Sequence, residues 1–230
     1  MKQQIKIAVV AAGLAVSAVT SQASLNFTGI NNAQFNASGS TFQLNPIAGS
    51  IATPQFDFTG TGAGLTGWIT GAPWAVTTGG LTSTTVGSIT YQQAPVVGGG
   101  VLNIYDGLKI LTGNLTWIQI HTLSDGQGGV SDSLSVNLTG MAYTGINAEL
   151  LALLAGQNGN LNMTFQFSGT SPSLTSIFSG TGVTSASYSG SISSAAAVPE
   201  PSTIVAGAML LIPFGCSAVR IIRNRSQTMA

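Results

Sequence analysis

The chain has 230 residues, of which only 5% are charged, against about 25% in an ordinary soluble protein. Its 30 glycines, 26 serines and 26 threonines indicate that hydroxyl and amide groups, rather than charges, keep its surface soluble. Between residues 24 and 195 one base, Lys109, stands against five acids, a net charge of −4: Asp57, Asp106, Asp125, Asp132 and Glu149. This balance leaves no basic face for a phosphate backbone, so nucleic acid is excluded as an expected partner.

The N-terminus is typical of a secretory signal peptide over residues 1–23. Lys2 and Lys6 form a positive start, an apolar run follows, and small residues then predict cleavage between Ala23 and Ser24. The alternative is a retained membrane helix. It is disfavoured because the strongly apolar part is short and polar residues follow it directly.

Residues 24–192 predict a mainly β ectodomain, an antiparallel β-sandwich or jelly-roll. The stretch "LNMTFQF" alternates, with Leu161, Met163, Phe165 and Phe167 on one face and polar residues on the other. "SLSVNLTG", "QFDFTG", "GSITYQQ", "VLNIYDG" and "LTWIQIHTL" are further short runs that are rich in β-formers and separated by glycine. Strands do not alternate with helices along the chain, which disfavours a parallel α/β fold.

One short helix is expected inside this region. Asn147 is placed to cap "AELLALLA", Glu149 lies in the first turn, and Gly156 is placed to end the helix. The strand pattern resumes after it and continues to about Ile192, and residues 193–197 are then expected to form a short linker.

Candidate chemistry in the ectodomain is sparse, and no cofactor is expected. The single histidine, His121, lies in a strand-like run without a nucleophile motif such as G-x-S-x-G, so we interpret it as an ordinary strand residue. The stretch "SDGQGGVSD" places Asp125 and Asp132 around a glycine-rich loop that could hold calcium. It lacks the ligand spacing of an EF-hand, so a hairpin turn is the favoured interpretation and the two aspartates are weak metal candidates.

The residues offer two further ligand classes. Five aromatic residues could stack on sugar rings if they share an exposed face, although aromatics in a sandwich usually lie in the core: Trp68, Trp74, Trp117, Tyr91 and Tyr105. Paired carboxylates could support glycoside hydrolysis, but the spacing of the acids singles out no pair.

The C-terminus predicts a transmembrane helix over 204–219. The uncharged run from Pro201 to Val219 has 19 residues, and a helix of that length spans roughly 28 Å, close to the hydrocarbon thickness of a bilayer. The basic cluster that follows is expected to stay cytoplasmic with the tail 226–230: Arg220, Arg223 and Arg225. A helix buried in a soluble core is the weaker alternative, because the run has no polar face.

The residues around the start of this run, 198–203, favour an extended conformation. Pro199 and Pro201 fix φ and remove two backbone donors, and Pro201 also pushes Glu200 toward an extended conformation. An extended segment with one charge suits a protease cleft, and on spacing alone a stiff linker is an equal alternative.

The order of motif, apolar span and arginines over 198–225 resembles the PEP-CTERM sorting signal. Six residues match the motif of that family: Val198, Pro199, Glu200, Pro201, Ser202 and Thr203. The resemblance implies processing by an exosortase-type membrane protease, with a cut near the motif and release to the cell surface or extracellular matrix. The family is associated with bacteria that make exopolysaccharide.

These observations predict an exported, non-catalytic surface or matrix protein that is anchored in the membrane transiently or permanently. The first alternative is a carbohydrate-binding module for the exopolysaccharide. The second is a secreted hydrolase, which the scarcity of carboxylates disfavours.

Overall fold

The structure is a computed structural model, and it describes residues 23–124, 132–168 and 172–194. These residues form a mainly β structure of antiparallel strands with two short helices, α2 (Ala148–Leu154) and α3 (Leu174–Ser179), which confirms the prediction of a mainly β, antiparallel structure. The strands are β1 (Ser24–Gly29), β2 (Ala33–Asn36), β3 (Thr41–Leu44), β4 (Phe56–Thr59), β5 (Thr66–Thr70), β6 (Trp74–Val76), β7 (Thr82–Val86), β8 (Ile89–Val97), β9 (Gly99–Tyr105), β10 (Ile110–Ser124), β11 (Asp132–Ala142), β12 (Gly159–Phe167) and β13 (Val183–Ser194).

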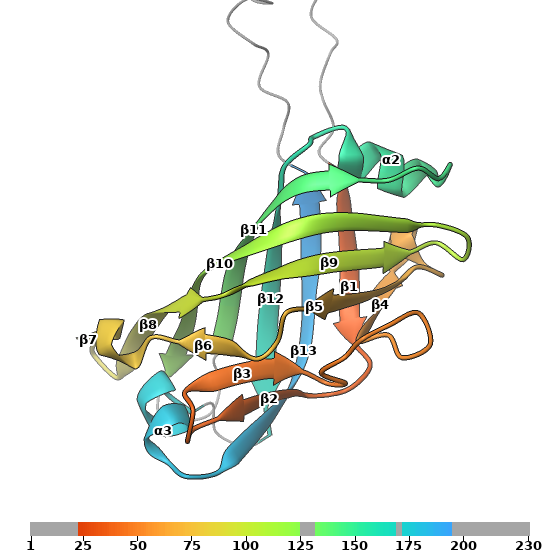
Figure 1. Cartoon of the computed structure of the whole chain (residues 1–230). Helices are drawn as coiled ribbons and strands as arrows, with labels where there is room; N and C mark the ends of the chain where they lie inside the picture. The colour runs from red at the N-terminus through yellow and green to blue at the C-terminus, as the bar shows by residue number, and fades with distance from the viewer. Residues whose placement is uncertain (1–22, 125–131, 169–171, 195–230) are drawn as a thin grey trace, which may run out of the picture. The chain divides into compact units, whose positions relative to one another are not determined.

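Hydrogen-bonded pairing joins the strands into two closed circuits that share β10, β11, β12 and β13. The first circuit runs β1-β4-β5-β9-β10-β11-β12-β13 and closes through the pairing of β13 with β1. The second runs from β13 through β2, β3, β6 and β8 and closes on β10. Figure 1 shows the resulting layers: β12, β13 and β1 lie vertically in the picture, behind β9, β5 and β3, which run across it.

Two long strands make this double closure possible. The first half of β10 pairs with β9 and its second half with β8, while β13 divides in the same way between β2 and β1. In the β10–β11 pair, the register shifts between Trp117 and Gln119, where β10 passes from one partner to the other. A bulge bends and twists its strand, which lets β10 serve both circuits.

The core is a cluster of buried side chains drawn from both circuits. Trp74 and Trp117 lie with ring centroids 4.4 Å apart, and Phe42 packs against both at 5.2 and 5.4 Å. A second aromatic group lies between β1 and β4, where the rings of Phe27 and Phe56 are 4.7 Å apart. Tilted and edge-on aromatic pairs of this kind add to the stabilisation that comes from burial.

The predicted alternation is confirmed in β11 and β12. Leu134, Val136 and Leu138 of β11 are buried, as are Leu161 and Met163 of β12, while the residues between them are partly or fully exposed. Such alternation arises because successive side chains of a strand point to opposite faces.

Helix α2 forms where it was predicted. The Asn147 side chain accepts hydrogen bonds from the backbone N–H groups of Glu149 at 3.0 Å and Leu150 at 3.2 Å, as an N-cap should. The chain takes its positive φ of 57° at Gln157, one residue after the Gly156 that was predicted to end the helix.

The prediction of one helix was wrong, because α3 is a second. The Ser173 hydroxyl caps it by accepting from the Ser176 N–H at 3.2 Å. Leu174, Ile177 and Phe178 are buried on one face at helical spacing. In Figure 1 α3 lies at the lower left, near β2.

The last strand continues through Ser193 and Ser194, which the sequence analysis assigned to a linker. The Ser194 N–H donates to the Ala23 carbonyl at 3.0 Å, and the Ala23 N–H donates to the Ser194 hydroxyl at 3.2 Å. The two ends of the described β region therefore meet as neighbouring strands.

Within the residues that the structure describes, no helix has the length and apolar character needed to cross a membrane. Residues 1–22 of the signal peptide predicted over 1–23, the predicted transmembrane run 204–219 and the tail 226–230 lie outside them.

Candidate functional site

A polar face extends across five neighbouring strands, β1, β13, β12, β11 and β10. The strand registers align its side chains in three rows that cross the strands. The first row is Ser24, Ser193, Asn160, Asn137 and Thr116; the second is Asn26, Ser191, Asn162, Ser135 and Gln119; the third is Thr28, Ser189, Thr164, Ser133 and His121.

The polar face points away from the core. Each of its side chains is exposed or partly exposed, whereas the alternating residues of the same strands, such as Leu25, Ile192 and Val136, are buried. Fourteen of the fifteen positions are serine, threonine, asparagine or glutamine, and the remaining one is His121. We refer to these fifteen residues as the hydroxyl–amide face.

Most polar groups of this face have no side-chain partner. Among the described residues, the side-chain pairs within it are Ser135 to Asn162 at 3.4 Å, and Ser133 with His121. Neighbouring strands lie about 4.8 Å apart and same-face residues about 6.7 Å apart along a strand, so the rows form a regular grid of donors and acceptors. Such a grid can hydrogen-bond an uncharged, hydroxyl-rich polymer, directly or through water.

His121 occupies the β10 end of the third row, where its Nε2 atom pairs with the Ser133 hydroxyl. Its Nδ1 atom is buried and has no hydrogen-bond partner among the described residues, and burial lowers the pKa of the imidazole. The pair resembles a nucleophile with its base, but no third described group orients the ring, which a catalytic triad requires. The sequence alone could not have paired these two residues, because they meet only through the β10–β11 register.

The aromatic residues considered for sugar stacking do not form an exposed platform. Trp68, Trp74 and Trp117 are all buried, and the indole N–H of Trp74 donates to the Gly99 carbonyl at 3.1 Å. Only Tyr91 and Tyr105 remain partly exposed. The three tryptophans therefore belong to the core, as large aromatic side chains usually do.

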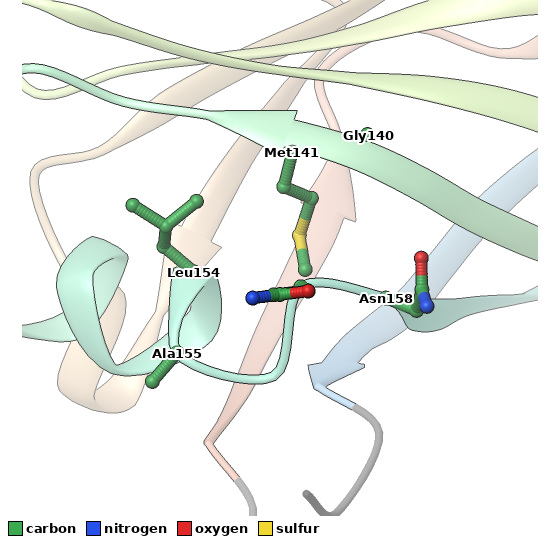
Figure 2. Close-up of a pocket in the computed structure, with 6 residues that line it drawn as sticks. Gly140, Met141, Leu154, Ala155 and Asn158 are labelled. Atoms are coloured by element: carbon green, nitrogen blue, oxygen red, sulfur yellow. The ribbon is translucent and has the colours of Figure 1, made fainter.

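A shallow hollow of about 440 Å³ lies between β11 and the turn that follows α2. Figure 2 shows the Met141 side chain pointing from β11 toward that turn, with Leu154 and Ala155 on one side and Asn158 on the other. Gln157, the residue with positive φ, also lines the hollow. Its lining is apolar apart from two side-chain amides and carries no charged group.

The carboxylates that the structure describes do not gather into a metal site. Asp106 accepts hydrogen bonds from the Tyr143 hydroxyl and from backbone N–H groups of its own turn. These bonds hold the pKa of its carboxyl below the ordinary value, and the bond from Tyr143 has the largest effect. Among the described residues no three potential metal ligands lie together. Asp125 lies outside those residues, and Asp132 begins β11, so calcium binding by that loop stays a hypothesis.

The residues of the predicted sorting signal lie outside the described part of the chain: Val198, Pro199, Glu200, Pro201, Ser202, Thr203, Arg220, Arg223 and Arg225. The predicted cleavage position between Ala23 and Ser24 is described, and it lies at the first residue of β1. The sequence analysis missed the hydroxyl–amide face, although the polar half of each alternating run signalled that such a face exists.

The chain gave no match to any protein-family model, to the curated proteins or to the solved structures with which it was compared.

Proposed function

We propose that this chain is an exported bacterial surface or extracellular-matrix protein, without catalytic activity, that is sorted through its C-terminal signal. The observation that carries the proposal is the ending: "VPEPST", an uncharged run and three arginines, in that order. The partners would be an exosortase-type protease and, before or without cleavage, the membrane. The part delivered to the surface or matrix would be the β region, as an antiparallel sandwich.

The limits of the β region support this proposal. All residues of the core cluster lie from Leu25 to Ile192, between the two predicted processing positions. Of the described residues, removal of 1–23 would take away Ala23, with its two hydrogen bonds to Ser194 and the packing of its partly buried side chain against the core. Cuts at the two predicted processing positions would therefore leave every residue of the buried core cluster in the mature chain.

The test is the intact mass and the C-terminal peptide of the protein recovered from the cells and the medium of its host. We expect a mature chain that begins at Ser24, lacks Arg225 and is found outside the membrane. A triple variant, Pro199→Ala with Glu200→Ala and Pro201→Ala, should keep Arg225 and stay in the membrane. Ser226→Ala serves as the control and should be processed like the wild type.

A wild-type chain that keeps Arg225 and occurs only in membranes would contradict sorting. In that case "VPEPST" is a linker and the protein a single-span surface anchor.

A second function is favoured by the hydroxyl–amide face, namely binding of a neutral exopolysaccharide. The face has many uncharged donors and acceptors, few of which are used within the protein. Each hydrogen bond to a sugar replaces one to water and contributes little by itself. A repeated polymer that contacts several rows at once can still bind through the sum of these contacts.

Native gel electrophoresis in the presence of the host polysaccharide tests this second function. The variant Asn137→Ala with Asn162→Ala changes two exposed amides on the face, and we expect it to lose most of the retardation shown by the wild type. Asn31→Ala with Asn32→Ala is the matched control, because both residues are exposed but lie in the turn between β1 and β2. Equal retardation of the two variants would exclude the face as the binding surface.

A further inference from the structure

Strand β7 is the one described strand with a free side. It pairs with β8, from Thr82 opposite Gln93 to Val86 opposite Ile89, and with no other described strand. Each of the other twelve strands pairs with another described strand on both of its sides, over all or part of its length. Figure 1 shows β7 at the left margin of the molecule, beyond β8. In the described fold, the two closed circuits therefore leave β7 as the one strand with a whole side unpaired.

The register defines which backbone groups this edge presents. A two-residue loop, Gly87 and Ser88, joins the strands, and Gly87 has the positive φ of 63° that such a hairpin turn needs. In an antiparallel ladder, hydrogen-bonded pairs alternate with non-hydrogen-bonded pairs. With Val86 and Ile89 as the pair that closes the loop, the N–H and C=O groups of Ser83 and Thr85 point away from β8.

The edge lacks most of the features that keep sheet edges from pairing. All five residues of β7 are exposed, and the sequence "TSTTV" has no charge, no proline and no bulge. Val86 is 73% exposed, and the neighbouring β8 carries no charged residue either. Natural edges are usually protected by lysine, proline or a bulge, and β7 has only its shortness.

We propose that β7 pairs with β7 of a second copy of this chain, antiparallel and about a two-fold axis at Thr84. In this register Ser83 of one copy faces Thr85 of the other, so the free N–H and C=O groups of both residues are satisfied by four backbone hydrogen bonds. Thr84 then faces Thr84 of the other copy in a non-hydrogen-bonded pair, where Cα atoms lie about 4.5 Å apart. A two-fold contact of this type is self-complementary.

Charge does not oppose the contact. The described residues carry four acidic side chains and one lysine, and none of them is in β7 or β8. Two identical uncharged strands can therefore approach without repulsion, whereas a charged partner strand would find no complementary charge on the edge. These features favour a second copy as the occupant.

The contact is weak by its size. Five residues on each side bury far less than the roughly 1,200 Å² of a stable complex. We therefore expect a transient contact that becomes populated where copies are crowded. The inference depends on β7 alone and holds whether or not the chain is exported.

Disulfide trapping of the full chain in detergent tests the pairing. The single cysteine is first removed by Cys216→Ala, and Thr84→Cys is then oxidised under mild conditions. Two cysteines at the proposed axis lie within the Cα separation that a disulfide needs. We expect Thr84→Cys to form disulfide dimers at least about ten-fold faster than the control Thr28→Cys.

Thr28 is a matched control because it is an exposed threonine in β1, which is paired on both sides. It also reports random collision and any association through other parts of the chain. Equal rates for the two cysteines would overturn the proposal.

Ser83→Pro in the Thr84→Cys background separates strand pairing from other contacts. Proline removes an N–H that points away from β8, so the hairpin should keep its stability while trapping slows several-fold. Unchanged trapping in this variant would overturn strand pairing. Mixed disulfides with other exported proteins, in place of dimers, would also overturn it and identify a foreign strand as the occupant.

Discussion

The Tyr143 hydroxyl donates a hydrogen bond to the Asp106 carboxylate and accepts one from the Asn147 N–H at 3.0 Å. The other Asp106 oxygen accepts from the backbone of Leu108 at 2.7 Å and of Lys109 at 2.5 Å. Because Asn147 caps α2, a single phenol joins the turn between β9 and β10 to the first turn of that helix.

Loss of this link should destabilise the fold in a pH-dependent way. We expect Tyr143→Phe to lower the free energy of unfolding by about 1–2 kcal/mol at pH 7, since a hydrogen bond to a charged group is lost. The bond holds the pKa of Asp106 below its ordinary value. Its contribution is therefore present above about pH 4, the unfolded range for aspartate, and is lost as pH falls through the lower folded pKa.

Urea unfolding at pH 7, 5, 3 and 2 measures this effect. The difference between wild type and Tyr143→Phe should shrink toward pH 2. Tyr105→Phe is the control from the same turn, because its hydroxyl donates to the Gly107 carbonyl at 2.6 Å and not to a carboxylate. A constant difference for Tyr143→Phe across the pH range would contradict the assigned role of Asp106.

Gln55 is fully buried, and both the nitrogen and the oxygen of its side-chain amide have hydrogen-bond partners. Its Nε2 donates to the Pro46 carbonyl at 2.7 Å, and its Oε1 accepts from the Ile69 N–H at 2.7 Å. Gln55→Leu leaves the buried Ile69 N–H and the part-buried Pro46 carbonyl without these partners, so we expect a loss of about 2–4 kcal/mol in unfolding free energy. Gln43→Leu, which breaks a part-buried amide pair with Gln34, should change it by less than about 1 kcal/mol.

Tryptophan fluorescence can follow these unfolding transitions, because all three tryptophans are buried. If Gln55→Leu were as stable as Gln43→Leu, the network around Gln55 would contribute no net stability.

His121 should make stability fall in mildly acidic solution. Burial lowers the pKa of the imidazole, so below about pH 6.5 the unfolded chain takes up a proton before the folded one. Stability is therefore lost as pH falls from the unfolded pKa to the folded pKa. His121→Gln cannot titrate, and we expect the advantage of the wild type over it to decline between pH 7.5 and pH 5.

This chain suits the measurement, because it has one histidine in all. An NMR titration of that ring gives the folded pKa directly. A value at or above 6.5, or parallel stability curves for the two proteins, would contradict the lowered pKa.

Local patterns predicted the features that depend on neighbours in the sequence. The inward face of β11 and the Asn147 cap both follow from spacings of two to four residues. Helix α3 was missed because "LTSIFS" is less than two turns long and contains β-branched and aromatic residues that also suit a strand.

The non-local features could not be predicted in this way. Closure of the two circuits depends on β13 meeting β1 and on β10 meeting β8, and no local pattern encodes either pairing. The hydroxyl–amide face could not be predicted for the same reason. Alternation places Asn137 and Asn162 on outward faces, but only the registers of β11 and β12 bring them onto one surface.

Gly190 shows a close approach that its position in a strand pattern only suggests. It lies in β13 opposite Phe27, and a Cβ atom there would come within 2.2 Å of the Asn162 carbonyl oxygen and 2.5 Å of the Phe27 ring. A backbone oxygen cannot move aside as a flexible side chain can, so Gly190→Ala forces β12 and β13 apart. Overpacking of this kind costs about 1–3 kcal/mol, and we expect the upper part of that range.

Gly182→Ala is the matched control: the new Cβ meets no atom within 4 Å, and the unfolding free energy should change by less than about 1 kcal/mol. Thermal and urea unfolding of the two variants compare them directly, and equal stability would mean that β12 and β13 have room for a methyl group between them.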